Sequence, residues 1–404
     1  MPGIVVGLRG TAALVTDFAS EVTANSPRPK LSERLGRIAD LLESSGIDLD
    51  EVGRIDKIRI GEHQTPVKIK QEDGTDRLEV ITSKADSLVI VPSWETGPEW
   101  PVIQPGPKVE KRKPVKPRTG RGWRTACVLP DMQVGFFWHD GGLIPTHDEE
   151  AIGIALAVIA AVQPDVIVMH GDNADFPEFG KYRLSPVFVQ TTQPTINRCT
   201  QLAVELRDAA PDAEIVWLAG NHEERLPNYV LDNARAAFGL RRGREPQGWP
   251  ILSMPHLCHF DDSGITWKPG YPANRYNIND QLRVIHGNKT GPTGTVAAKY
   301  LTRGKKSVLF GHVHSAEYAE LTDEDGWQMI AASAGCLCRT DGKVPSTNSG
   351  HDDDGLPVTV HENWQQGMFV VDYRPDSSAF ALDRVSIRHG WSRWRGQEFG
   401  KVVK

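Results

Sequence analysis

From residue 123 onward, short runs of apolar residues alternate with longer stretches in which apolar residues recur at helical spacing. Short apolar runs are typical of buried strands, and the longer stretches are typical of helices that cover a sheet. The expected strands are residues 125–129, 166–169, 215–218, 282–285, 308–310, 328–332, 368–372 and 379–385. The expected helices are residues 146–161, with Thr146 as N-cap, 195–209 and 293–301. Strands that alternate with helices in this way predict an α/β fold.

The first 104 residues carry a different pattern. Apolar residues at helical spacing predict one helix, on which they are Leu31, Leu35, Ile38 and Leu42. Short β-like runs follow at residues 55–60, 66–70, 78–82 and 88–91, and Asp73-Gly74 predicts a hairpin turn between two of them. We therefore expect residues 1–104 to form a small α+β unit, and we see no catalytic constellation in it.

Residues 105–122 separate the two patterns. They are rich in proline and in basic side chains and nearly free of apolar ones, which predicts a semi-rigid linker. Two interpretations of the linker remain open: a solvated tether, or a basic strap that contacts a phosphate backbone. Residues 123–390 are expected to form the main domain, followed by a basic tail with tryptophans at residues 391–404.

Composition limits the class of protein. The chain has 404 residues, of which 39% are hydrophobic and 24% charged, so it can bury a sizeable core and is not wholly disordered. The formal net charge of -6 argues against a histone-like protein. An odd, sparse set of five cysteines does not make a disulfide framework and favours a reducing compartment, and the lack of a Cys-x-x-Cys pair argues against a thiolate zinc site. The apolar stretch at residues 151–162 is too short to span a bilayer, so we expect a cytoplasmic protein without a membrane partner.

Polar residues with catalytic potential follow five of the predicted strands. They lie at residues 131–133, 171–175, 220–223, 286–287 and 311–314, and they read DMQ, GDNAD, GNHE, HG and GHVH. In open α/β sheets, ligands bind outside the carboxyl ends of the strands. Five such groups, each just after a strand, therefore predict one shared site.

In this order, the five groups resemble the motif blocks of the calcineurin-like metallophosphoesterases, D-x-H, G-D-x-x-D, G-N-H-D/E, H-G and G-H-x-H. The resemblance covers about residues 123–390, and the last four blocks match fully. The first block departs, because Gln133 stands where the family has histidine; its surroundings are similar to phage-encoded members, for which the location would be the bacterial host cytoplasm. The resemblance implies a four-layer α/β/β/α sandwich, with the small α+β unit in front of it.

Carried over block by block, the resemblance implies two divalent metal ions that share Asp172. The ligands of the first metal would be Asp131, Gln133, Asp172 and His314, and those of the second would be Asp172, Asn221, His286 and His312. Carboxylate, amide and imidazole groups suit manganese, magnesium, iron or zinc. Manganese is expected first, because the amide oxygen of Gln133 binds late transition metals less well than imidazole does. With only two carboxylates against two divalent ions, the site is expected to be net positive, which favours a phosphate.

The resemblance places His222 beside the leaving group, as a general acid or as a donor to the phosphoryl oxygens. Asp175 or Glu223 could orient a histidine, and Asp175 could instead be a helix N-cap. The remaining histidines of this region are expected to be structural or exposed: His139, His147, His170 and His256.

We expect a dinuclear metal-dependent phosphoester hydrolase, a phosphodiesterase or nuclease that acts on DNA or RNA. Two features favour nucleic acid: the basic linker, and the tail, where arginines interleave with Trp391 and Trp394. The tail has a second interpretation, in which its tryptophans pack on the domain. The alternatives for function are a hydrolase of small phosphodiesters or phosphomonoesters, and a binding scaffold with weakened catalysis.

Overall fold

The computed structural model describes residues 52–70, 76–92, 108–111, 122–181, 184–245, 247–302, 304–344 and 361–401. The chain divides into two compact units, Met1–Val102 and Ile103–Lys404. None of the helices in the described ranges is long and apolar enough to cross a membrane.

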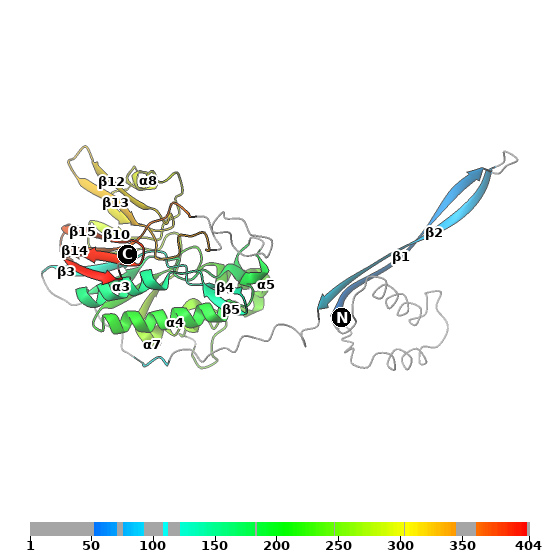
Figure 1. The fold of residues 1–404 in the computed structure, drawn as a ribbon, viewed down its shortest axis with the longest axis horizontal. Helices are drawn as coiled ribbons and strands as arrows, with labels where there is room; N and C mark the ends of the chain where they lie inside the picture. Colours follow the sequence, from blue (N-terminus) through cyan, green and yellow to red (C-terminus); the bar gives the residue numbers. More distant parts are fainter. Residues whose placement is uncertain are drawn as a thin grey trace. The chain divides into compact units, whose positions relative to one another are not determined.

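In the first unit, strands β1 (Val52–Lys70) and β2 (Asp76–Pro92) pair antiparallel into a two-stranded ribbon (Figure 1). The four short β-like runs are therefore parts of two continuous strands, which corrects the sequence prediction. The polar residues between the runs do not interrupt the pairing, because the ladder uses main-chain groups. The expected helix with Leu31–Leu42 and the turn at Asp73-Gly74 lie outside the described residues.

The second unit is built on two mixed sheets. The larger sheet has the order β15-β14-β3-β6-β7-β8. Strands β3, β6, β7 and β8 run parallel to one another, and β14 pairs antiparallel with both of its neighbours, β3 and β15. Its strands are β3 (Arg124–Leu129), β6 (Val166–Met169), β7 (Glu214–Leu218), β8 (Ile265–Lys268), β14 (Gln366–Tyr373) and β15 (Phe380–Ile387).

The smaller sheet has the order β12-β13-β11-β10-β9, with β10, β11 and β13 parallel at its centre. Its strands are β9 (Tyr276–Asn277), β10 (Leu282–Val284), β11 (Ser307–Leu309), β12 (Ala316–Thr322) and β13 (Gln328–Ala334). Sequence periodicity does not say which strands share a sheet, because strands of both sheets read as short apolar runs.

Successive side chains of a strand point to opposite faces, and here both faces of each central strand are apolar. Val128 and Val168 of the larger sheet pack with Leu309 of the smaller one, so one core lies between the two sheets. The opposite face of the larger sheet packs against α3 (Glu149–Val162) and α4 (Thr192–Ala209).

Helix α8 (Val296–Leu301) packs on the outer face of the smaller sheet. Figure 1 shows the resulting order, with α8 beside β12 and β13 at the top and α3 and α4 beneath the larger sheet. The four-layer α/β/β/α architecture that the motifs imply is therefore confirmed.

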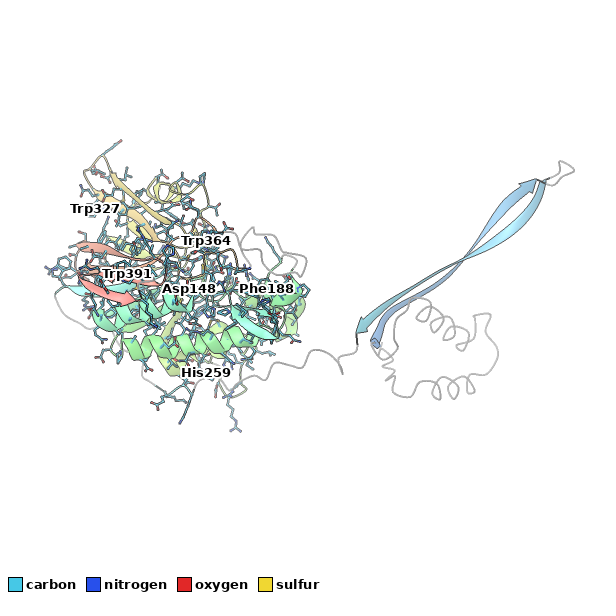
Figure 2. The ribbon with its side chains drawn as sticks, in the orientation of Figure 1. Asp148, Phe188, His259, Trp327, Trp364 and Trp391 are labelled. Atoms are coloured by element: carbon cyan, nitrogen blue, oxygen red, sulfur yellow. The ribbon has the colours of Figure 1, made fainter. Side chains whose placement is uncertain are left out.

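Helix α3 corrects one detail of the sequence prediction. It begins at Glu149, and its N-cap is Asp148, whose carboxylate accepts the backbone N–H groups of Glu150 and Ala151. Thr146 is not the cap; its hydroxyl donates to the carbonyl of Gln133 at 3.2 Å. Figure 2 labels Asp148 among the side chains of the unit.

The tail residues form a hairpin of β16 (Trp391–Trp394) and β17 (Gln397–Gly400). Trp394 packs against the same core as α3, and Phe399 is buried in that core. Arg395 forms an ion pair with Asp372 at 2.7 Å and lies over the ring of Trp394. The packing interpretation therefore holds for Trp394, and Arg395 is already paired.

The remaining elements are short and connect the layers. They are β4 (Phe136–His139), β5 (Gly142–Pro145), η2 (Pro177–Phe179), η3 (Pro186–Phe188), α5 (Arg225–Asn233), η4 (Arg235–Ala237), α6 (Met254–Leu257) and α7 (Phe260–Ser263).

Candidate active site

The five groups of motif residues meet at one edge of the sandwich, where strands of both sheets end. Asp131, Asp172 and Asn221 follow β3, β6 and β7 of the larger sheet. The histidines follow β10 and β11 of the smaller sheet, and they are His286, His312 and His314. Each sheet thus supplies one side of the site: the larger sheet supplies Asp131, Asp172 and Asn221, and the smaller sheet supplies these three imidazoles.

Several motif residues at this edge have a left-handed backbone conformation that residues other than glycine rarely adopt. Four of the motif residues have a positive φ, between 51° and 72°, and they are Gln133, Asp172, His312 and His314. L-residues rarely adopt this region, and such residues concentrate at functional sites. A side chain at Gly220 would overlap Asp172, so this position must be glycine for the two loops to approach.

Asp131 is fully buried and surrounded by imidazoles. Its Oδ1 lies 3.3 Å from Nε2 of His314 and 4.0 Å from Nδ1 of His286, and it accepts the backbone N–H of His312 at 3.1 Å. Although burial opposes ionisation, the hydrogen bond to His314 and the nearby imidazoles lower the pKa of Asp131 to about 2. The carboxylate therefore stays ionised at neutral pH.

Asp172 lies at the centre of the site. Its Oδ2 is 3.3 Å from Nε2 of His286 and 3.6 Å from Nε2 of His222, and its Oδ1 accepts the backbone N–H of His222 at 2.8 Å. Oδ1 of Asn221 lies 3.0 Å from the same Nε2 of His286. Burial opposes the charge of His286, but Asp172 and Asp131 outweigh it and raise the pKa of His286 to about 9.

The donor set fits divalent cations. Two groups of side chains, Asp131 with His170 and His286, and Asp172 with His286 and His312, each bring their ligand atoms within 4.8 Å of one another. Three buried polar atoms near them have no hydrogen-bond partner in the described part of the chain: Oε1 of Gln133 and Nδ1 of His170 and His286. Unpartnered buried polar atoms cost free energy, and bound cations would offset part of that cost.

His222 lies at the edge of this group and is held by Asp175. Its Nδ1 is 2.8 Å from Oδ1 and 3.1 Å from the carbonyl of Asp175. Asp175 is not a helix N-cap, since the next helix, η2, begins two residues later and has no side-chain cap. Between the two roles considered for Asp175, the geometry is that of a carboxylate that orients a histidine.

Glu223 contacts the backbone rather than a histidine. Its carboxylate accepts the backbone N–H groups of Asp172, Asn173 and Gly220 at 2.8–2.9 Å, and the indole N–H of Trp217 at 3.2 Å. Burial, followed by the charge of Asp172, raises the pKa of Glu223. The residue therefore joins the loops after β6 and β7.

Two residues at the site were not predicted from the sequence. His170, expected to be structural or exposed, is 2% exposed, and its Nδ1 lies 3.6 Å from Oδ2 of Asp131. Burial lowers the pKa of His170 to about 4, so its imidazole is neutral. Arg225, the first residue of α5, contacts both His222 and Asp175.

Two curated proteins that the chain resembles in sequence are phage proteins. It is 24% identical over 178 residues to the Gene 54 protein of Mycobacterium phage L5, and 26% identical over 179 residues to the Gene 54 protein of Mycobacterium phage D29. Each match covers 42% of this chain and 65% of the relative, so the chain spans less than two thirds of the length of these curated relatives. No protein-family model matches the chain.

Similar solved structures include two phosphoesterases. One is Yfce, a phosphoesterase from E. coli, with a TM-score of 0.27 and 11% identity over 65% of this chain and 100% of the other. The second is the purple acid phosphatase PPD1 from yellow lupin seeds, with a TM-score of 0.35 and 12% identity over 84% of this chain and 58% of the other. Both scores are low, so the architecture and the site of this chain rest on its own sheets and side chains. In both respects, the chain resembles the calcineurin-like metallophosphoesterases.

Proposed function

We propose that this chain is a metal-dependent phosphoester hydrolase whose chemistry is carried by residues 123–390. The observation that carries the proposal is the meeting of two buried carboxylates, Asp131 and Asp172, with three imidazoles from the other sheet. Ionised carboxylates, neutral amides and imidazoles at one edge are ligands for divalent cations of intermediate hardness.

The contacts support two metal positions that share Asp172. Asp131, Gln133, Asp172 and His314 would hold the first ion, and Asp172, Asn221, His286 and His312 the second. Nε2 of the Gln133 amide lies 3.5 Å from His314, and Oδ1 of Asn221 lies 3.0 Å from His286, so each amide is close to a histidine proposed for the same ion. When bound, two divalent ions supply Lewis-acid polarisation of the phosphoryl group and activation of water. Manganese or magnesium suits the first position best, because the amide of Gln133 stands there in place of an imidazole.

His222 and Asp175 would assist without binding metal. Asp175 fixes the ring of His222 through Nδ1, which leaves Nε2 on the side of Asp172. A group bound at Asp172 therefore faces Nε2, the atom from which His222, once protonated there as well as on Nδ1, would donate to a phosphoryl oxygen or to the leaving group.

For the substrate, we propose the phosphodiester backbone of DNA or RNA. The support comes from neither the linker nor the tail. Most basic residues of the linker lie outside the described residues, and Lys108 lines the same hollow as Arg207, at the carboxyl end of α4, which leads into the amino end of β7 and so lies at the edge opposite the site. Trp394 and Arg395 are occupied by packing and by ion pairs.

An arginine-rich segment that continues from the site supports nucleic acid instead. It follows α5, which begins three residues after His222. Its exposed side chains combine cations with apolar groups, as in surfaces that bind single strands. They are Arg235, Phe238, Leu240, Arg241, Arg242 and Arg244, with Phe238 50% exposed. The similarity to two phage proteins supports action inside an infected bacterial host.

Hydrolysis assays test both levels of the proposal. Metal-free protein is supplied with manganese and offered single-stranded DNA, RNA, a chromogenic phosphodiester and a chromogenic phosphomonoester. We expect cleavage of the diester and of at least one nucleic acid, and salt-sensitive binding of the nucleic acid that the combined change Arg241→Ala and Arg244→Ala weakens. Cleavage of the small esters alone would favour the small-substrate alternative. Failure with manganese, magnesium, zinc and iron alike would favour the binding scaffold.

A further inference from the structure

Arg225 lies between the two residues that flank the metal ligands. Its Nη1 donates to the carbonyl of Asp175 at 2.7 Å and to Oδ1 of Asp175 at 3.3 Å, and its Nη2 lies 2.9 Å from Nε2 of His222. The side chain of Asp175 is fully buried, whereas that of Arg225 is 21% exposed. The guanidinium is thus anchored on a buried carboxylate, while the side chain that carries it is partly exposed.

The contacts also define which atom donates. Nδ1 of His222 faces the carboxylate and carbonyl of Asp175, two acceptors, so the N–H of the ring lies on Nδ1. Nε2 then accepts from the guanidinium, which is always a donor. His222 and Asp175 together hold the plane of Arg225 in place.

Arg225 has donors to spare. A guanidinium carries five N–H groups, and the contacts to Asp175 and His222 use three of them. For Nε and for the second N–H of Nη2, the described residues offer no hydrogen-bond partner. A partly exposed guanidinium with two free N–H groups is suited to a planar, bidentate contact with an oxyanion.

His222 links the guanidinium of Arg225 to the carboxylate that we assign to both metals. Nε2 of His222, which Arg225 contacts, is 3.6 Å from Oδ2 of Asp172. A phosphoryl group held at Asp172 therefore comes within reach of Arg225 once the guanidinium turns from Nε2 to the phosphoryl oxygens. That movement also frees the lone pair of Nε2 of His222, which must take up a proton before the ring can donate to the substrate.

We propose that Arg225 is a substrate-binding residue that clamps the phosphoryl oxygens of the scissile phosphoester. The proposal rests on the proposed function, because the phosphoryl group is taken to bind at the metal ligands. It adds one positive charge to the substrate face of the site without adding a ligand to either metal.

Binding of inorganic phosphate tests this role apart from turnover. Metal-loaded wild type, Arg225→Gln and Arg225→Lys are titrated with phosphate by calorimetry, and metal content is measured on the same samples. We expect full metal content in all three, phosphate binding about 10- to 100-fold weaker in Arg225→Gln, and an intermediate loss in Arg225→Lys, because lysine keeps the charge but not the fork. Arg374→Gln is the matched control, since Arg374 pairs with Asp376 beyond the end of β14, at the amino edge of β3.

Activity gives a second readout. Arg225→Ala should raise KM for a chromogenic phosphodiester, and free guanidinium should restore part of the lost activity, which a merely structural role would not allow. Unchanged phosphate affinity in a metal-loaded Arg225→Gln protein would overturn the proposal and leave the hydrolase assignment intact. If wild type itself neither binds phosphate nor cleaves any ester, the hydrolase assignment fails, and the role of Arg225 fails with it.

Discussion

The carboxylate of Glu223 accepts the backbone N–H of Asp172 at 2.9 Å, so a residue of the loop after β7 fixes the main chain of the loop after β6. The same carboxylate accepts the N–H groups of Asn173 and Gly220. Because Asp172 has a positive φ, its side chain reaches the site only if this main chain is held. Glu223 thus acts on the metal ligands through the backbone that carries them.

Glu223→Ala should therefore destabilise the unit by about 2–5 kcal/mol, since it leaves several buried N–H groups without an acceptor. It should also weaken metal binding, although Glu223 touches no metal ligand side chain. Glu223→Gln keeps one acceptor oxygen and should have a smaller effect. Denaturant unfolding of the full chain measures the change, and an unaltered midpoint in the alanine variant would show that the N–H groups find other partners.

His222→Ala should separate binding from catalysis. Both metal positions should fill as in the wild type, because none of the proposed ligand atoms is removed. Turnover should fall by about 10²–10⁴-fold, the usual range for a lost proton donor. The loss should be smaller for esters with good leaving groups, which need no protonation. If the variant instead loses metal, His222 is a ligand and its assigned role is wrong.

The sequence predicted the site better than its surroundings, for physical reasons. Each motif follows a buried strand, and parallel strands end at one edge, so Asp131 and Asp172 could be expected to meet. Arg225 carried no such pattern, since an arginine at a helix start is ordinary and its contact depends on where α5 leaves the sheet. His170 lies beside Asp131 only because β3 and β6 are neighbours in the sheet. In the ribbon of β1 and β2, residues 61–65 are mostly polar and so gave no strand signal in the sequence, although their main chain continues the pairing.

Gln133→His should tighten the first metal position, most strongly for zinc or iron, because imidazole nitrogen suits these ions better than an amide oxygen. Oε1 of Gln133 is buried and has no hydrogen-bond partner among the described residues. Exchanging the amide oxygen and nitrogen by a half-turn of the amide group places Oε1 beside His314. Gln133→Leu, which keeps much of the volume without a donor atom, should weaken the position instead. Calorimetric titration of each metal-free variant measures the metal affinity of the first position. Two tightly held zinc or iron ions in the native protein would show that the amide of Gln133 does not weaken that position.

The metal-free protein should lose stability as the pH rises from about 7 to 9.5. The pKa of His286 is raised from 6.5 to about 9 by Asp172 and Asp131 against the effect of burial. A raised folded-state pKa contributes stability that is fully present below about pH 6.5 and is lost as the pH passes about 9. His170, with its pKa near 4, titrates below this window. Thermal unfolding in the presence of a chelator should show a shallower pH dependence in His286→Gln; identical slopes would contradict the charge on His286.

Titration of the metal-free chain with manganese, while hydrolysis of a chromogenic phosphodiester is followed, tests the central claim most directly. We predict two binding steps, with activity appearing only at the second and weaker step, which we assign to the position that contains Gln133. Asp172→Asn, which removes the shared charge, should remain folded and show no activity at any manganese concentration. Full activity after a single equivalent, or full activity in Asp172→Asn, would contradict the two-metal site.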